Sequence, residues 1–587
     1  MNFKRIFYFF GLYKWTFVIG TIFVILANLA SSYTNRLVEL LINNIIDKLS
    51  LENTTRDSIV SDVVHFLLFY LGLTILSAVF TFLMRQTIIV ASRKIEQRLK
   101  DDLYNHIQHL DITHFKKYPI GDFMSRMAED VGKIRELFGP AVMYLVNMIT
   151  TLSVSIFFML KINAELTWYV LIPLPFLSIF IYVFNIFSLR FNTKLQEELA
   201  SMNSLAQESY NGIRIIKSFT LENKVFGSFS NLSELYKKQS LKLVKLDSLF
   251  MPIVSLLMGM SILMAVYKGG TLLIDDKIKI GGLTSFIMFV NRLLWPVMSI
   301  GWVASLVQKG KASLARYEEI MNLPLEKKNN SESTQSIHTG DIEFKDVSFT
   351  YPETGIEAVK NLNFKIKQGE RWLIIGKTGC GKSTLAELLM KFYDDYQGHI
   401  LINGQDIREI STDTIRQSIS YIPQDVFLFS DTVEKNIAFA SENYDTEHVI
   451  AAAKDAQIHN EIIHFKEKYK TVVGERGITL SGGQKQRISI ARALIKPSPI
   501  YLFDDCLSAV DVETEKKLID AMNQRDNGRT MILITHRIFN QLNFDKVIVL
   551  HDGEIIELGS HTELMNQKGF YYELYKKQEL RKEVEVS

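Results

Sequence analysis

Residues 371–384 read RWLIIGKTGCGKST, and this stretch decides the fold of the second half of the chain. Arg371–Ile375 has the continuous apolar character of a buried parallel strand. The residues that follow match the phosphate-binding loop G-x-x-x-x-G-K-[ST] in full. The residues predicted to bind nucleotide are Gly376, Lys377, Thr378, Gly379, Cys380, Gly381, Lys382, Ser383 and Thr384.

The loop has the chemistry that a triphosphate needs. Its glycines let the backbone curl so that successive N–H groups point at phosphate oxygens. Lys382 brings a positive charge to the β- and γ-phosphates, and Ser383 offers a hydroxyl to Mg²⁺. Apolar residues at i, i+3, i+4 and i+7 from Leu385 predict a helix whose N-terminal dipole faces the phosphates. A GTPase or a small kinase would share this loop.

A second apolar run ends in a carboxylate. Ile500–Asp504 reads IYLFD, and the end of a parallel strand lies in the ligand crevice. We therefore predict that Asp504 holds the magnesium ion, usually through water. The alternative is an ordinary buried strand with a capping aspartate.

The motif LSGGQ at 480–484 settles the class of ATPase. It precedes a predicted helix over Gln486–Ile495, which gives a second helix N-terminus suited to phosphate. One nucleotide does not need two such ends from the same face, so the arrangement suits two cassettes that sandwich ATP. The residues concerned are Ser481, Gly482, Gly483 and Gln484.

These motifs resemble the ATP-binding-cassette family, for which LSGGQ is diagnostic. The resemblance implies ATP and Mg²⁺ as cofactors, an adenine-stacking role for Tyr351 and a switch role for His536. It also implies that Gln424 senses the metal, joining Ser383 and Asp504 there, and takes part in catalysis. Further matches are Gly474–Gly477 before LSGGQ and the dimer-crossing loop Ser508–Asp511. Taken singly, Tyr351, Gln424 and His536 would be ordinary surface or core residues.

The first half of the chain has the composition of a membrane domain. A membrane-spanning helix needs about 20 mainly apolar residues, and six stretches qualify. They are Trp15–Leu41, Val63–Ser92, Gly139–Leu160, Leu166–Leu189, Phe250–Ile274 and Leu283–Val307. A short interfacial helix is expected before the first. Six spans exclude a soluble cassette ATPase that acts on translation or DNA.

The fold class is therefore multi-domain: an all-α polytopic membrane domain of six helices, type I exporter-like, followed by an α/β P-loop ATPase cassette. We predict a membrane domain over 1–322, a linker over 323–340, the cassette over 341–577 and a charged tail over 578–587.

The distribution of charge predicts the topology. Long basic segments follow the second and fourth spans, and positive charge stays on the cytosolic side. The protein is then expected in the bacterial inner (plasma) membrane, with both termini and the cassette in the cytosol. Four basic residues oppose this charge pattern: Lys48, Arg56, Lys277 and Lys279. The net charge of +2 gives no sign of a nucleic-acid partner. Cys380 and Cys506 are the two cysteines, and we expect both to be reduced thiols.

The two cytosolic segments have helical spacing, interrupted at Tyr118–Gly121 and at Asn211–Gly212. Each break predicts a short transverse element, which is either a helical corner or a contact that transmits motion. The segments resemble the coupling loops of exporters in the same family, which implies a domain-swapped dimer of half-transporters. The matching residues are Phe115, Gly121, Asp122, Arg126 and Asp130 in the first and Glu208, Gly212, Arg214 and Lys217 in the second.

One residue departs from the family pattern. The general base that follows the magnesium aspartate is normally Glu, and here it is Asp505. Aspartate is shorter than glutamate by about 1.5 Å. Either the shorter base still works, but slowly, or it marks a deliberately slow site. The run DDCLSAVD at 504–511 resembles the partner-requiring half of heterodimeric multidrug exporters. This resemblance favours a heterodimer over a homodimer, although the intact His536 argues against a heterodimer.

The main hypothesis is ATP-driven export or flipping of amphipathic small molecules or lipids by alternating access. The alternative is an ATP-gated or regulatory membrane subunit with little turnover. Arg292 lies in the sixth span, where a charge is costly and is a functional candidate by default. A structural arginine, paired across the bundle, is the other interpretation.

Overall fold

The computed structural model describes residues 4–49, 56–326, 341–441, 444–474, 477–524, 528–538 and 544–586. The chain divides into two compact units: Met1–His109 with Pro119–Leu323, and Leu110–Tyr118 with Pro324–Ser587. The segment Leu110–Tyr118, which the sequence assigned to the membrane domain, therefore clusters with the cassette. Most of the predicted linker, from residue 327 on, and Glu475–Arg476 of the loop before LSGGQ lie outside the described residues.

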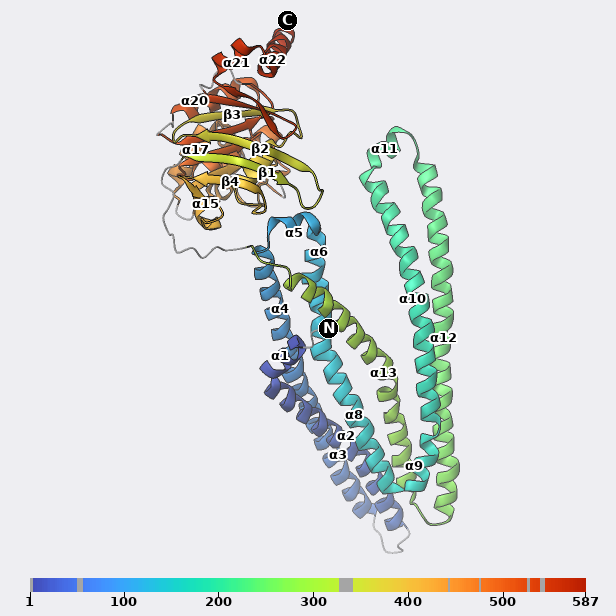
Figure 1. Cartoon of the computed structure of the whole chain (residues 1–587). Coiled ribbons are helices and arrows are strands. Elements are labelled where there is room, and N and C mark those ends of the chain that lie inside the picture. Colours follow the sequence, from blue (N-terminus) through green and yellow to red (C-terminus); the bar gives the residue numbers. More distant parts are fainter. Residues whose placement is uncertain are drawn as a thin grey trace. The chain divides into compact units, whose positions relative to one another are not determined.

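The first unit is entirely helical (Figure 1). Six of its described helical stretches are long and apolar enough to cross a membrane, in agreement with the sequence. They begin with α2 (Lys14–Leu49), α3 (Arg56–Met84), α6 (Ile120–Ser125), α9 (Ala164–Leu171), α12 (Glu222–Ile274) and α13 (Ile280–Met321). The other elements of this unit are α1 (Lys4–Leu12), η1 (Arg85–Ile89), α4 (Val90–Gln108), η2 (Arg126–Asp130), α7 (Val131–Glu136), η3 (Leu137–Ala141), α8 (Val142–Ile162), α10 (Pro173–Asn211) and α11 (Ile213–Ser218).

The breaks predicted in the two basic helical segments are confirmed. Helix α5 (Ile112–Lys117) ends before Tyr118, and α6 begins directly after Pro119. A residue that precedes proline is pushed out of the helical region, and Tyr118 has an extended backbone with φ −105° and ψ 123°. Gly212 separates α10 from α11 in the second segment.

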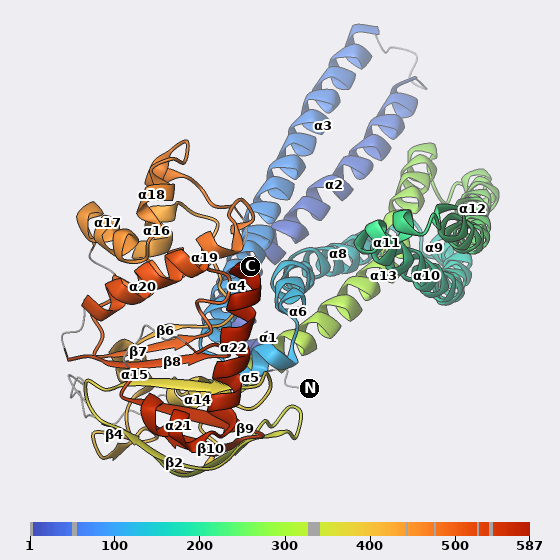
Figure 2. The same ribbon diagram turned by 90° about the horizontal axis from the view of Figure 1, so that it is seen from above.

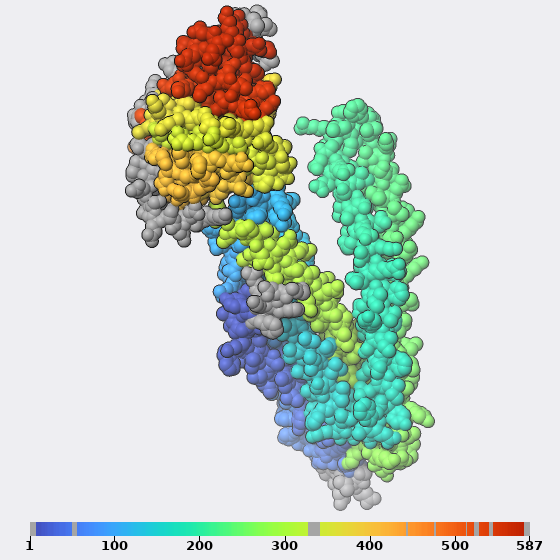
Figure 3. All heavy atoms as spheres, in the orientation of Figure 1, coloured from blue at the N-terminus to red at the C-terminus, as the bar shows by residue number. Residues whose placement is uncertain are grey.

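Helices α10 and α12 lie side by side and form a two-helix arm with α11 at its tip (Figures 1 and 3). Apolar side chains are exposed at this tip: Tyr210 is 75% exposed, Ile215 63% and Phe219 71%. Large exposed apolar patches mark interaction sites in soluble parts of proteins.

Charged side chains fix the part of the first unit around residues 122–130. Arg126 is buried and forms ion pairs with Asp122 and Glu319, each at 2.9 Å. Asp130 is 2% exposed and accepts hydrogen bonds from Ser313 and Arg316 of α13. Two residues of this segment, Arg126 and Asp130, thus tie it to α13.

The lysines that oppose the positive-inside pattern are neutralised by neighbouring carboxylates. Lys48 Nζ lies 2.5 Å from Asp62, and Lys279 Nζ lies 2.6 Å from Asp47. Lys277 pairs more loosely with Asp275, at 3.4 Å. These pairs lower the cost of placing positive charge at the end of the spans opposite the coupling segments.

The cassette contains two sheets (Figure 1). The six-stranded sheet has the order β10-β9-β3-β8-β7-β6, parallel except for β10, and the antiparallel sheet has the order β2-β1-β4-β5. The strands are β1 (Ile342–Thr350), β2 (Glu357–Ile366), β3 (Arg371–Gly376), β4 (Gln397–Ile402), β5 (Gln405–Asp406), β6 (Ile419–Ile422), β7 (Ile500–Asp504), β8 (Thr530–Thr535), β9 (Lys546–His551) and β10 (Glu554–Gly559).

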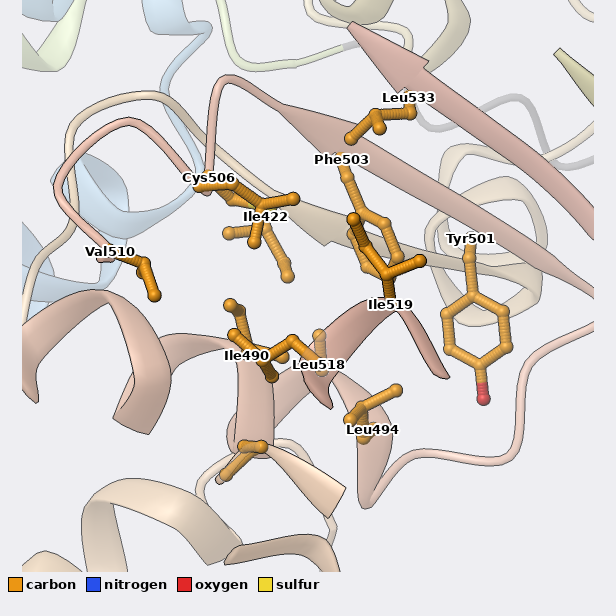
Figure 4. Packing of buried hydrophobic residues seen from close by; sticks show 14 of the residues in the cluster. Ile422, Ile490, Leu494, Tyr501, Phe503, Cys506, Val510, Leu518, Ile519 and Leu533 are labelled. Carbon is orange, nitrogen blue, oxygen red and sulfur yellow. The ribbon is translucent and has the colours of Figure 1, made fainter. Parts of the chain in front are cut away.

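The parallel strands are buried on both faces, as their continuous apolar sequences predicted. In β3, Leu373 and Ile375 pack into one core, whereas Trp372 and Ile374 pack into the other. Figure 4 shows the first core, in which Phe503 of β7 meets Leu533 of β8 and Ile519 of α20 (Val512–Gln524).

Helices cover the two faces unequally (Figure 2). The phosphate-loop helix α14 (Lys382–Leu389) packs in the core shared with the antiparallel sheet. The other helices are α15 (Thr412–Ser418), α16 (Val433–Ala438), α17 (Thr446–Asp455), α18 (His459–Ile462), η4 (Lys468–Lys470), α19 (Gly482–Leu494), α21 (His561–Gln567) and α22 (Phe570–Val586).

Helix α22 continues to Val586, beyond the end that we predicted near Lys577. The prediction treated the residues after 577 as a charged tail. Its residues are mostly Glu, Lys, Leu and Arg, however, and these have high intrinsic helix propensity even without packing.

Candidate active site

The phosphate loop joins β3 to α14, as the sequence predicted. Gly381 has φ +95°, and a Cβ built on it would lie 2.2 Å from the carbonyl oxygen of Ala358. No other residue fits there, because the left-handed conformation and the close backbone approach both exclude a side chain. Lys382 Nζ lies over the loop and donates to the carbonyl oxygens of Gly376 at 2.9 Å and Lys377 at 2.7 Å.

A cavity of about 500 Å³ opens above this loop. It brings together most of the residues that the sequence singled out. The predicted residues that line it are Tyr351, Thr378, Gly379, Gly381, Lys382, Ser383, Thr384, Gln424, Asp504, Asp505 and His536. Gly376, Lys377 and Cys380 belong to the loop but do not line the cavity.

Asp504 has the environment of a metal ligand. It is 2% exposed at the end of β7 and accepts a hydrogen bond from Ser383. Burial and the neighbouring Asp505 raise the pKa of this carboxyl above its ordinary value. A divalent cation beside Asp504 would offset both effects.

The donor set fits Mg²⁺. A hydroxyl (Ser383), a carboxylate (Asp504) and an amide (Gln424) face one cavity. Within the described ranges, no group of three or more His, Cys, Asp or Glu side chains could hold a metal. Mg²⁺ does not need such a group, because in nucleotide sites it takes one or two protein carboxylates together with phosphates and water.

Asp505 and His536 form a polar pair. Asp505 Oδ1 lies 3.1 Å from His536 Nδ1 and 3.4 Å from the hydroxyl of Thr535. The backbone of Asp505 is left-handed, with φ +46°, and its N–H donates to the carbonyl oxygen of Ile534 at 2.8 Å. The carboxylate is therefore drawn toward the end of β8.

Tyr351 is anchored to the phosphate-loop helix. Its hydroxyl donates to Glu387 Oε2 at 2.9 Å and lies 2.9 Å from Thr384 Oγ1. Burial, reinforced by Glu387, raises the pKa of Tyr351 to about 12, so the phenol stays neutral at physiological pH. Its aromatic ring borders the cavity, where a base could stack on it.

The LSGGQ motif lies apart from this cavity, since none of its residues is among those that line it. Ser481 caps α19 by accepting from the Gln484 N–H at 3.3 Å, and Gln484 Oε1 accepts from the Ser481 N–H at 2.9 Å. A Cβ on Gly483 would meet the carbonyl oxygen of Ala509 at 2.8 Å. The motif is thus folded and partly exposed, but within one cassette it lies away from the phosphate loop.

The sequence did not predict every residue of the cavity. Its remaining lining comes from β2 and from the turn between β9 and β10. These residues are Ile356, Glu357, Ala358, Lys360, Asp552 and Gly553. They carry no motif, and only the pairing of β9 with β3 brings that turn to the loop.

Arg292 is anchored to the first span rather than left unpaired. It donates to Ser31 Oγ at 2.6 Å and to Asn28 Oδ1 at 3.2 Å. Asn28 in turn bonds to Asn147 and Thr151 of α8. Among the described residues these partners are neutral, and Arg292 Nε is buried with no hydrogen-bond partner. This network favours the structural interpretation of the arginine.

Two family models match the chain: "ABC transporter transmembrane region" over residues 17–297 and "ABC transporter" over residues 359–508. The chain belongs to the ABC transporter family. It is a multi-pass membrane protein of the exporter type that binds ATP, and its ATPase is coupled to transport.

The relatives include exporters. The multidrug resistance-like ATP-binding protein MdlA of Escherichia coli is 32% identical over 520 residues, covering 88% of each chain. The ATP-dependent lipid A-core flippase of Syntrophus aciditrophicus is 34% identical over 487 residues, covering 83% of this chain and 81% of the flippase. The structure of a bacterial Atm1-family ABC exporter with ATP bound gives a TM-score of 0.80 at 25% identity, covering 96% of this chain and 99% of that one. These relatives do not favour the ATP-gated or regulatory alternative. Half-transporters of this type dimerise.

Proposed function

We propose that this chain is one half of an exporter that uses Mg²⁺-ATP to move amphipathic small molecules or lipids across the bacterial inner membrane. The observation that carries the proposal is the cavity in which the phosphate loop, Asp504, Asp505 and His536 converge, in a chain with six candidate spans. The basic cytosolic segments support cytosolic termini and a cytosolic cassette. A linker over 323–340 would join the membrane domain to the cassette, with a short tail from 578.

At the nucleotide site, Ser383, Asp504 and Gln424 would hold Mg²⁺, which when bound neutralises charge on the phosphate oxygens. Lys382 would bind the β- and γ-phosphates, and Tyr351 the adenine. Asp505 would accept the proton of the attacking water, since a general base must lie within hydrogen-bond reach of it. His536, 3.1 Å from Asp505, would hold the carboxylate and the γ-phosphate in register.

The position of LSGGQ supports a head-to-tail pair of cassettes. In such a pair, Ser481–Gln484 of this chain would complete the site of the partner, whereas this chain's own site would receive the partner's motif. The exposed apolar tip of the arm at Tyr210, Ile215 and Phe219 supports a domain-swapped partner. We favour a heterodimer whose other half carries the usual Glu, because Asp505 is the shorter base and LSGGQ is intact.

Two substitutions test this assignment. In a heterodimer, Asp505→Asn should leave much of the turnover of the assembled transporter, whereas Ser481→Arg should abolish most of it. In a homodimer both changes affect both sites, so Asp505→Asn should stop turnover as fully as Ser481→Arg. Fast hydrolysis by the isolated chain that is lost in Asp505→Asn would overturn the heterodimer.

A cavity in the membrane domain supports an amphipathic substrate. It has a volume of about 840 Å³ and lies between α10 and α13. Ile181 and Val297 line one end, and Gln196, Gln308 and Lys309 line the end nearer the coupling segments. Apolar and hydrogen-bonding groups in one cavity suit a molecule that has both characters.

Filling this cavity tests the assignment. Ser305 lines it, so Ser305→Trp should reduce transport of an amphipathic dye into inverted vesicles without changing the affinity for ATP. Val79 is exposed on α3, which does not line the cavity, and Val79→Trp is the matched control. Equal transport by both variants would remove this cavity from the pathway.

A further inference from the structure

The short helix α5 (Ile112–Lys117) belongs to the first coupling segment, yet it clusters with the cassette. Asp111 caps it by accepting a hydrogen bond from the Thr113 N–H at 2.9 Å. The backbone at Leu110 also forms a bridge with Leu325, which belongs to the same compact unit. The helix is therefore held in a defined place within this unit.

Lys116 is the residue of α5 that makes charged contacts with the cassette. Its Nζ donates to the hydroxyl of Tyr393 at 2.6 Å and forms an ion pair with Glu387 at 3.4 Å. The same ammonium lies 5.1 Å from the ring centre of Tyr351 and 5.0 Å from that of Tyr393. Both distances are within the range of a cation–π interaction.

Glu387 connects this lysine to the nucleotide cavity. Its Oε1 faces Lys116, while its Oε2 accepts a hydrogen bond from the Tyr351 hydroxyl. Glu387 lies on α14, one turn beyond Thr384, which also contacts that hydroxyl. A single carboxylate is thus shared between the coupling helix and the aromatic residue that borders the cavity.

The aromatic rings limit how Tyr351 can move. Tyr351 and Tyr393 meet edge to face, with ring centres 5.5 Å apart and planes at 82°. Phe349 lies against both rings, at 5.0 and 4.9 Å. Tyr351 is therefore held in three ways: its ring packs against Phe349 and Tyr393, its hydroxyl bonds to Glu387, and Lys116 lies over its ring.

We propose that Lys116 is a positioning residue for the nucleotide base: it holds Tyr351 in the pose that stacks adenine and thereby links base binding to the coupling segment. This inference rests on the proposed function, in which Tyr351 contacts the base. The link works in both directions, because a coupling free energy between two sites is reciprocal. The affinity for a triphosphate that carries no base should not depend on Lys116, since the phosphate loop alone holds the triphosphate.

The neighbouring lysine provides a matched control. Lys117 lies on the same short helix, carries the same charge, and its ammonium lies 5.8 Å from the ring of its own neighbour Tyr118. Lys116→Met and Lys117→Met therefore make the same chemical change, and only Lys116→Met removes the contacts with Glu387 and the two tyrosines. Lys116→Arg keeps the charge and should recover part of the effect.

The first test compares ATP with inorganic tripolyphosphate on the full-length, assembled transporter in lipid nanodiscs with Mg²⁺. Lys116→Met should raise the Kd for ATP about three- to tenfold, and should change the Kd for tripolyphosphate less than about twofold. Lys117→Met should change neither. An unchanged Kd for ATP, or equal weakening of both ligands, would overturn the proposal.

The second test measures the link to the coupling segment directly. ATP should slow hydrogen exchange of the amides of Ile112–Lys117 in the unmodified transporter and in Lys117→Met, but not in Lys116→Met. Full protection in Lys116→Met contradicts the link. Lys382→Ala separates this result from the proposed function: if that variant binds both ligands normally, the phosphate-loop assignment itself is wrong.

Discussion

Lengthening Asp505, the proposed general base, is the most informative perturbation of this chain. Asp505 is held at 3.1 Å from His536 and at 3.4 Å from Thr535, on its own side of the cavity. Asp505→Glu adds one methylene, which extends the carboxylate by about 1.5 Å. A displacement of about 1 Å can change a rate about a hundredfold, which corresponds to about 2.7 kcal/mol in the activation free energy.

The backbone adds a separate cost in stability. Asp505 has φ +46°, and aspartate tolerates the left-handed region better than most residues. Glutamate should lose about 1 kcal/mol there. This strain is present in the ground state and in the transition state alike, so it lowers the stability of the variant and leaves kcat free to rise by up to about a hundredfold, with the KM for ATP nearly unchanged because the phosphate loop is untouched.

The assay is phosphate release by the chain purified by itself and reconstituted in nanodiscs, at saturating Mg²⁺-ATP. Asp552→Glu is a matched control, because Asp552 lines the same cavity, has φ +48° and lies 3.4 Å from His551. Only Asp505→Glu should raise kcat. A folded Asp505→Glu protein with unchanged or lower kcat would refute the idea that the reach of the base limits this site.

Three further outcomes are expected. Lys382→Ala should raise the Kd for ATP at least about tenfold with normal membrane insertion, and unchanged affinity would exclude the phosphate-loop assignment. Arg292→Ala should lower the stability of the membrane domain while its folded fraction transports normally, because the arginine bonds to Ser31 and Asn28 of the first span, whereas altered transport at unchanged stability would establish a functional arginine. Asp406 has a pKa of about 2 although its burial acts to raise it, because hydrogen bonds from Arg408 and others outweigh burial. The contribution of ionised Asp406 to the stability of the folded cassette is therefore complete above about pH 4 and is lost as the pH falls through about 2. Asp406→Asn should make acid unfolding less steep in this range, and an identical acid transition would contradict the pairing.

The sequence predicted those features that lie in contiguous stretches. The phosphate loop, the strand that ends at Asp504 and the six apolar spans are each written in one run of residues, and the structure has all of them. The helix break at Pro119 follows from backbone chemistry that a single residue imposes, whereas Gly212, with φ −91° and ψ 14°, has a conformation open to any residue.

What the sequence could not predict depends on contacts between distant segments. Asp552 reaches the cavity because β9 pairs with β3, and strand order is not encoded locally. In the sequence Lys116 is one charge among many in a basic segment. Its partners Glu387 and Tyr393 are 271 and 277 residues away. Neither pairing leaves a signal in the spacing of nearby residues.

The loop after Asp505 connects this proposed base to the LSGGQ motif within one chain. The Ser508 hydroxyl donates to the Asp505 carbonyl oxygen at 3.1 Å and accepts from Gln486 Nε2 at 3.0 Å. Gln486 Oε1 also accepts from the Ala509 N–H at 2.9 Å, and the Ala509 carbonyl borders Gly483. A short chain of hydrogen bonds and packing therefore joins the base of one site to the motif offered to the other. Movement of α19 cannot leave this loop unchanged, so the two ATP sites of a dimer would be coupled through the interior of each cassette.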